Sequence, residues 1–313
     1  MPVPPPAPLF VFRGDTNEVH SLLFHETSDK LTLYTGSTDG TVHIWDLMTN
    51  KKISSFKTGT LTCLALHFMD FNLLTQDKSC HLKVWTLKED SPSCMYEKKF
   101  NNFSFCKINV LRNKLAIPQP NSMTEIHEYV SSSICRIARL SYPDESMKLG
   151  EVQQLKLFDH KSSLFTAIVY ENGSLAIWDV DKSEVVSNFK ITSATPMAFD
   201  FDEEKLQGVC GSNEKDVVFF KVDEQLQLTK IKEIEITNAG VGCLRIRPDR
   251  KVLAAGCWDG KVRIFSWKTC KLLAVLDCHK ASILDVTFTF SNQPSMMVAS
   301  ASDKKISLWN IYE

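Results

Sequence analysis

Residues 38–56 read TDGTVHIWDLMTNKKISSF, a turn followed by one strand and the start of another. Asp39-Gly40 is a hairpin signal, because a two-residue hairpin turn needs positive φ and glycine adopts it at little cost. Apolar residues then alternate with other residues up to Trp45, which is the period of a strand with one buried face. The stretch therefore predicts antiparallel strands and not helices.

The same pattern recurs along the chain. Residues 171–189 read ENGSLAIWDVDKSEVVSNF and residues 302–313 read SDKKISLWNIYE. An aromatic residue closes the equivalent strand in seven places: Trp45, Trp85, Tyr129, Trp178, Phe220, Phe265 and Trp309. Consecutive aromatic marks are 40 to 49 residues apart and average 44, a period typical of four-stranded propeller blades. The sequence therefore predicts an all-β, seven-bladed β-propeller.

The two ends of the chain complement each other. The last repeat stops four residues after Trp309 and lacks the outer strand that other repeats have after their aromatic mark. Residues 9–15, LFVFRGD, resemble the outer-strand segment KLLAVLDCH at 271–279. We expect this N-terminal segment to supply the missing strand and close the propeller, which leaves no exposed edge between blades.

Composition and charge narrow the class of protein. The chain has 313 residues, with 36 Lys+Arg against 37 Asp+Glu. A chain of this length can bury a large core, and we expect a Pro-rich segment 1–8 followed by one propeller domain at 9–313. The balanced charge argues against nucleic acid or a membrane as partner, and no apolar run is long enough to span a bilayer. The ten cysteines lack metal-binding spacing, which predicts reduced thiols in a cytoplasmic and/or nuclear protein.

Catalytic motifs are missing from the sequence. It contains neither HExxH nor GxSxG, the marks of zinc hydrolases and of a nucleophile elbow. Gly240-Val241-Gly242 lacks the third glycine of a dinucleotide fingerprint, so we interpret it as a turn. We therefore expect no enzyme activity, no cofactor and no metal site. A propeller enzyme whose site is assembled from separate blades stays open as an alternative, because one fold hosts many functions.

Over nearly the whole chain, the tight Asp turn and the strand ending in Trp-Asp resemble the WD-repeat propellers. In that family a His, a Ser or Thr, the turn Asp and the Trp form a hydrogen-bonded tetrad within one blade. The resemblance implies a complete tetrad in the last repeat: His279, Ser300, Asp303 and Trp309. It implies a partial one in the first repeat: Thr35, Asp39 and Trp45, with Asp15 where the His is expected. Phe220 and Phe265 lack an indole N–H, so their blades must depend more on apolar packing.

Trp258 is the leading candidate for partner binding, because it stands in the hairpin sequence Cys257-Trp258-Asp259-Gly260. Tryptophan is enriched at interface hot spots. Two interpretations are open: the indole contacts a partner, or it packs over the neighbouring blade. The sixth repeat is also the most basic, and Arg247 and Arg250 are candidates for binding an acidic partner segment; the alternative is a solvated strand face.

A closer resemblance rests on RPDRK followed by GCWDGKVRIF within residues 246–279, together with PPPAPLFVFRG at 4–14. These segments resemble the guanine nucleotide-binding protein subunit beta-like protein 1 family, which includes the fungal ASTRA-associated protein 1. The resemblance implies a non-enzymatic adaptor or scaffold for protein–protein interaction. It further implies a role in cochaperone-assisted maturation of phosphatidylinositol-3-kinase-related kinases, with the cochaperone assembly and kinase clients as partners.

Two other functions stay open: a propeller that reads chromatin or acidic peptides, and a signalling adaptor like the G-protein β subunit. A true β subunit has an N-terminal helix that coils with the γ subunit. Here only eight Pro-rich residues precede the first expected strand, too few for a heptad seam. We therefore expect no G-protein γ subunit among the partners.

Overall fold

The computed structural model describes residues 6–13, 17–27, 30–69, 71–87, 92–100, 102–142, 147–290 and 295–311. These residues form 28 strands in seven four-stranded sheets and no helix, which confirms the all-β expectation. None of them builds a helix that could span a membrane. Asp15, the expected substitute for the first tetrad His, lies outside the described residues.

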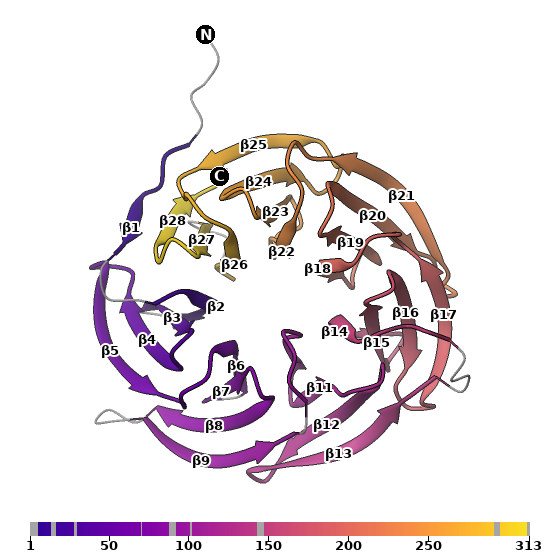
Figure 1. Ribbon diagram of the computed structural model, residues 1–313. Coiled ribbons are helices and arrows are strands. Elements are labelled where there is room, and N and C mark those ends of the chain that lie inside the picture. The colour runs from indigo at the N-terminus through magenta and orange to yellow at the C-terminus, as the bar shows by residue number, and fades with distance from the viewer. Residues whose placement is uncertain are drawn as a thin grey trace. The chain divides into compact units, whose positions relative to one another are not determined.

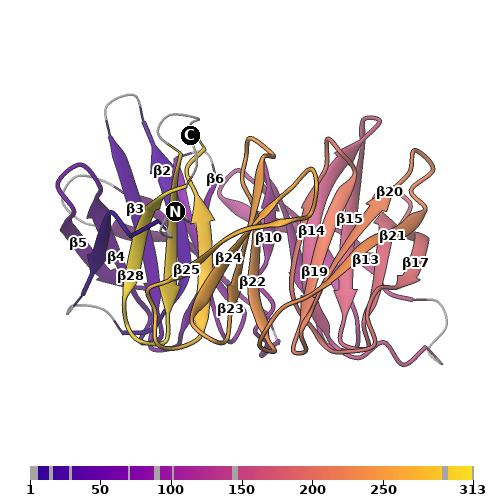
Figure 2. The same ribbon diagram turned by 90° about the horizontal axis from the view of Figure 1, so that it is seen from above.

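The chain divides into two compact units, residues 1–66 with 237–313 and residues 67–236. The boundary falls within strand β6 (Cys63–Met69). Figure 1 labels the strands of both units except β10, which is labelled in Figure 2.

The first unit contains three complete antiparallel sheets. One sheet has the order β2 (Val19–Glu26), β3 (Leu31–Ser37), β4 (Thr41–Asp46), β5 (Lys51–Lys57). The next has the order β22 (Val241–Ile246), β23 (Val252–Cys257), β24 (Lys261–Ser266), β25 (Leu272–Asp277). The third has the order β26 (Ile283–Phe288), β27 (Met296–Ala301), β28 (Ile306–Asn310), β1 (Phe10–Phe12).

The second unit repeats this design. Its complete sheets are β10 (Asn109–Leu111), β11 (Lys114–Pro118), β12 (Thr124–Val130), β13 (Ser133–Leu140); β14 (Val152–His160), β15 (Ser163–Tyr170), β16 (Ser174–Asp179), β17 (Glu184–Lys190); and β18 (Pro196–Asp202), β19 (Gln207–Ser212), β20 (Asp216–Val222), β21 (Leu228–Glu235). The remaining sheet consists of β6, β7 (Asn72–Asp77), β8 (His81–Leu87) and β9 (Pro92–Lys99). Figure 2 shows the strands of individual sheets, such as β22, β23 and β24, running side by side.

The predicted N-terminal strand is confirmed. Strand β1 pairs antiparallel with β28, with Phe10 opposite Leu308 and Phe12 opposite Ile306. Phe12 is buried, and its ring centroid lies 5.0 Å from that of Trp45 on β4. Burying a phenylalanine side chain contributes about 1.5–3 kcal/mol. The strand thus completes the sheet of β26–β28 and adds an aromatic ring to the core shared with the sheet of β2–β5.

The turns between second and third strands differ in one respect from the expected two-residue hairpins. Three residues connect these strands, and the last is a glycine with positive φ: Gly40 at 73°, Gly173 at 91° and Gly260 at 78°. The N–H of Gly40 donates to the carbonyl of Ser37 at 3.1 Å, which closes a tight turn ending in a left-handed residue. Because the strands are antiparallel, this turn and the segment preceding the first strand lie at the same end of a sheet.

Phe220 shows how a blade manages without the indole N–H. Its buried ring stacks on Phe199 and Phe201 with centroid distances of 6.0 and 6.1 Å. On the paired strand, a Cβ at Gly208 would lie 2.0 Å from Cζ of Phe220, so the ring occupies the space above that glycine. The expected reliance on apolar packing is visible in this stack.

Candidate partner-binding site

Trp258 begins the turn between β23 and β24, and its side chain is 41% exposed. Its backbone N–H donates to the carbonyl of Gly240 at 2.9 Å. Its own carbonyl accepts a hydrogen bond from Oγ of Ser282 at 3.1 Å. Since the main chain is held from two sides, the partial exposure of the indole is a fixed feature of this turn.

The indole packs against a floor of bare backbone, formed by Gly240 and Gly242. A Cβ at Gly240 would lie 2.2 Å from Cδ2 and Cε3 of Trp258, and one at Gly242 would lie 3.3 Å from Nε1. Gly240 also has φ of 95°, a conformation that glycine adopts readily. The segment interpreted from sequence as a simple turn is therefore the support of the Trp258 ring. One part of the indole packs on the protein and the rest stays open.

Asp259 anchors the turn beside Trp258. Its Oδ1 and Oδ2 accept hydrogen bonds from Nη1 and Nη2 of Arg263 at 3.0 and 2.7 Å, and Oδ2 also accepts from Nδ2 of Asn238 at 3.0 Å. Burial raises the pKa of Asp259, but these bonds outweigh it and lower the pKa to about 2. The carboxylate is ionised at neutral pH, and the Arg263 side chain that neutralises it is only 4% exposed.

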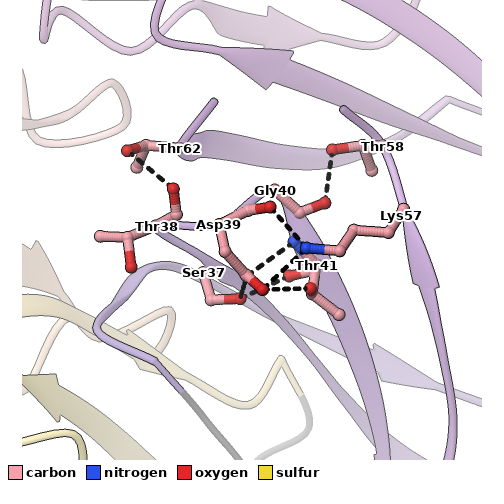
Figure 3. A network of polar contacts seen from close by, with 8 residues as sticks. All are labelled: Ser37, Thr38, Asp39, Gly40, Thr41, Lys57, Thr58 and Thr62. Carbon is pink, nitrogen blue, oxygen red and sulfur yellow. Dashed lines mark hydrogen bonds and ion pairs between the residues drawn. The ribbon is translucent and has the colours of Figure 1, made fainter. Parts of the chain in front are cut away.

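Asp39 occupies the equivalent turn in the sheet of β2–β5 and uses different partners (Figure 3). Oγ of Ser37 donates to Oδ1 at 2.9 Å, and Oγ1 of Thr41 donates to Oδ2 at 2.9 Å. Nζ of Lys57 reaches from β5 to Oδ2 at 2.7 Å. Burial opposes ionisation, but the bonds from Lys57, Ser37 and Thr41 prevail and hold the pKa of Asp39 well below its usual range. A cation thus pairs with the turn carboxylate in both sheets.

The last repeat contains a hydrogen-bonded tetrad with one unexpected member. Nδ1 of His279 lies 3.0 Å from Oδ1 of Asp303, and Nε2 lies 2.7 Å from Oγ of Ser307. Nε1 of Trp309 donates to the same Ser307 hydroxyl at 2.7 Å. Burial lowers the pKa of His279, although Asp303 acts in the opposite direction. The chain of contacts therefore joins a neutral imidazole to the indole through Ser307.

The assignment of Ser300 to this tetrad is wrong. Ser300 is buried, but its Oγ donates to the carbonyl of Val19 on β2 at 2.9 Å. It joins the last sheet to the first one in the same unit. Ser307 takes the place in the tetrad because it lies two residues before Trp309 on β28, so both side chains share one face of the strand.

The first repeat explains why the last one needs this substitution. Nε1 of Trp45 donates to Oγ1 of Thr35 at 3.1 Å, as the family pattern implies. Thr35 lies ten residues before Trp45, and the equivalent position before Trp309 is Ala299, which has no hydroxyl. The indole N–H of Trp309 must find another acceptor, and Ser307 supplies it.

The two candidate arginines do not extend the Trp258 surface. Arg247 is 2% exposed; its Nε donates to Oδ1 of Asp249 at 2.8 Å, and its guanidinium donates to the carbonyl of Ile311. Its assignment as an exposed partner-binding residue is therefore corrected: it is a structural cation inside the fold. Arg250 is half-exposed in the β22–β23 turn, which lies at the opposite end of the sheet from Trp258.

Sequence reasoning missed the residues that build the site, namely the Gly240–Gly242 floor and the Asp259–Arg263 pair. The sequence does contain a sign of the Asp259–Arg263 pair, because an Arg four residues after the turn Asp lies on the adjacent strand. In the described ranges, no three His, Cys, Asp or Glu side chains lie close enough together to hold a metal ion. What the geometry offers is a supported aromatic surface.

Comparison with known proteins identifies the repeat. The family model described as "WD domain, G-beta repeat" matches residues 6–46, and the one described as "Anaphase-promoting complex subunit 4 WD40 domain" matches residues 209–293. Among solved structures, the Cps50 (Swd1) β-propeller domain of Myceliophteria thermophila matches with a TM-score of 0.83 and 15% identity, over 98% of this chain and 100% of that one. The fold is therefore a seven-bladed WD-repeat β-propeller.

Two relatives match over nearly their full lengths. Guanine nucleotide-binding protein subunit beta-like protein 1 of Mus musculus is 32% identical over 325 residues, with 99% of this chain and 97% of that protein covered. ASTRA-associated protein 1 of Schizosaccharomyces pombe is 25% identical over 372 residues, with 98% of this chain and 99% of that protein covered.

Proposed function

Because the chain belongs to the WD-repeat family of guanine nucleotide-binding protein subunit beta-like protein 1, we propose that it is a non-enzymatic adaptor that binds other proteins. We further propose that it acts in cochaperone-assisted maturation of phosphatidylinositol-3-kinase-related kinases, in the cytoplasm or nucleus. The likeness to several ASTRA-associated proteins supports a place in a multiprotein assembly.

The observation that carries the adaptor proposal is the exposed indole of Trp258 on its glycine floor. Tryptophan is enriched among interface hot spots, the few contact residues whose truncation costs at least about 2 kcal/mol of binding energy. The fixed main chain also reduces the entropy that binding must remove. Trp258 therefore has the properties of a preorganised contact residue.

The state of the turn carboxylates supports a role without catalysis. Asp39, Asp259 and Asp303 are each hydrogen-bonded within their own sheet, and each has a pKa below its ordinary value. A carboxylate with a depressed pKa is a weak general base at neutral pH. In this state they stabilise turns, which fits the proposed non-enzymatic role.

The experiment is affinity capture from a native cell extract followed by mass spectrometry. Wild type is compared with Trp258→Ala and with Phe290→Ala, which removes another exposed aromatic side chain from the same unit. Equal thermal unfolding of the three proteins is established first. We expect wild type and Phe290→Ala to recover cochaperones and kinases of the phosphatidylinositol-3-kinase-related class, and Trp258→Ala to lose them.

Two results would each reject one part of the proposal. Equal recovery by all three proteins would keep the adaptor and reject Trp258 as its contact. A clean wild-type capture with histones or a G-protein γ subunit, and without cochaperones, would reject the proposed pathway.

A further inference from the structure

A second exposed aromatic surface lies in the other unit, on the segment 102–106 between β9 and β10. Phe103 and Phe105 are 67% and 63% exposed. Nζ of Lys78, in the turn between β7 and β8, lies 3.9 Å from the ring centroid of Phe105 and 5.1 Å from that of Phe103. Both distances are within the range of cation–π attraction. We call these three side chains the Phe-Lys clasp.

The segment that presents the clasp is tied down at both ends. Nδ2 of the buried Asn102 donates to the carbonyl of Pro118 at 2.8 Å. At the other end Cys106 is buried, and its carbonyl accepts a hydrogen bond from Nε2 of Gln76 at 3.0 Å. Because the flanking residues are fixed, the outward placement of two phenylalanines is a property of the fold and not of a free end.

The clasp is also joined to the turn that carries its lysine. The N–H of Ser104, between the two phenylalanines, donates to the carbonyl of Lys78 at 3.3 Å. Oγ of Ser104 in turn accepts a hydrogen bond from the N–H of Cys106 at 2.8 Å. The loop and the turn therefore form one connected surface.

The charge of the clasp is not neutralised by a carboxylate of the described chain. Lys78 forms no ion pair with any described residue, and its Nζ faces the rings of Phe103 and Phe105. The adjacent carboxylate of Asp77 instead accepts hydrogen bonds from Ser79 and from the N–H of His81, at 2.7 to 3.0 Å. Since no carboxylate among the described residues pairs with this ammonium, an anionic group of a bound molecule can do so.

We propose that the Phe-Lys clasp binds an acidic and apolar peptide segment of a protein partner. An Asp or Glu carboxylate of that segment pairs with Lys78, while neighbouring aliphatic or aromatic side chains cover Phe103 and Phe105. One lysine offers little to a nucleic acid or an anionic membrane, each of which needs several cations, and the whole chain has a net charge of −1. The inference rests on the proposed adaptor function and adds the chemistry of one partner segment.

The test uses the purified full chain and a phage-displayed library of random dodecapeptides. Peptides are selected on wild type after depletion on the Phe103→Ala/Phe105→Ala variant. We expect the selected peptides to share an Asp or Glu next to Leu, Ile or Phe. A selected peptide is then synthesised with a fluorescein label, and its affinity is measured by fluorescence anisotropy.

Four variants separate the contributions. Phe103→Ala/Phe105→Ala and Lys78→Glu should each weaken binding by about tenfold or more. Lys78→Arg keeps the charge and should retain affinity within about threefold, because arginine also stacks on aromatic rings. Phe71 is 93% exposed and lies between β6 and β7, in the sheet that also carries the Lys78 turn. Phe71→Ala should leave binding unchanged.

Several outcomes would overturn the proposal. They are the absence of peptides that depend on Phe103 and Phe105, a consensus rich in Lys or Arg, or binding that survives Lys78→Glu. All variants alter exposed or half-exposed side chains, and matching thermal unfolding excludes a loss of fold. The selection does not involve the cochaperone assembly, so failure here with successful capture rejects only the clasp, and the reverse rejects only the proposed pathway.

Discussion

The indole of Trp258 lies so close to Gly240 that a single added methyl group at Gly240 would stand 2.2 Å from two ring carbons. Position 240 therefore controls whether Trp258 keeps its place. The relationship links a residue before β22 to the turn after β23, which the antiparallel sheet brings to the same end.

Gly240→Ala should displace the indole and destabilise the protein by about 1–3 kcal/mol, because the methyl group clashes with the ring and alanine is strained at positive φ. In a Trp258→Ala background the clash is gone, and only the backbone strain of about 1 kcal/mol should remain. Urea unfolding of the two single variants and the double variant measures this coupling.

Gly173→Ala is the matched control for this comparison of single and double variants. Gly173 also has positive φ, at 91°, but it faces the carbonyl of Thr192 and not Trp258. Its cost should add to that of Trp258→Ala within about 0.5 kcal/mol. Additive behaviour of Gly240→Ala as well would show that the ring and the glycine are energetically independent, contrary to the structure.

Asp259→Asn should destabilise the protein by about 3–5 kcal/mol, because it leaves the buried Arg263 guanidinium without its counter-charge. Lys268→Ala, at an exposed position between β24 and β25 of the same sheet, should cost within about 0.5 kcal/mol. Chemical unfolding at pH 7 distinguishes the two. Similar costs for both variants would mean that the Asp259–Arg263 pair contributes nothing special to the turn.

The same carboxylate predicts a pH dependence. The pKa of Asp259 falls from 3.8 to about 2 on folding, so its stabilising contribution is complete above pH 3.8 and is lost as the pH falls through 2. The stability difference between wild type and Asp259→Asn should therefore shrink between pH 4 and about 2. Unfolding free energies measured across that range check the trend, and a difference that stays constant or grows would refute it.

Ser307→Ala should destabilise the last sheet by about 1–3 kcal/mol, because it removes the acceptor of the Trp309 N–H and the partner of Nε2 of His279. Ser300→Ala removes one hydrogen bond to Val19 and should cost about 1 kcal/mol. Urea unfolding of the two variants measures both losses, and we expect the lower unfolding midpoint for Ser307→Ala. A larger loss for Ser300→Ala would favour the tetrad that the family pattern implies.

Much of the fold follows from periodic features of the sequence. The recurrence of an aromatic residue every 40 to 49 positions gives the number of sheets, since each sheet contributes one such strand. The missing outer strand of the last repeat and the apolar pattern of residues 9–15 together predict strand β1. The resemblance to WD-repeat propellers and to the beta-like protein 1 family is confirmed by the comparisons.

The site was harder to predict because it depends on contacts between distant residues. Arg247 is buried and donates a hydrogen bond to the carbonyl of Ile311, 64 residues away, and its neighbouring sequence gives no sign of this. Gly240 supports Trp258 through a tertiary contact that local turn chemistry does not reveal. Ser307 replaces Ser300 because strand alternation directs residues two apart to one face, and a family motif alone does not specify that choice.

The central claim is that Trp258 contacts a protein partner of this adaptor. Hydroxyl-radical footprinting tests it most directly. Oxidation of Trp258 is measured by tandem mass spectrometry in the free protein and in the captured assembly, with the exposed Met48 of the same unit as reference. We predict that oxidation of Trp258 falls severalfold in the assembly relative to that of Met48. Equal oxidation of Trp258 in both states would contradict the claim.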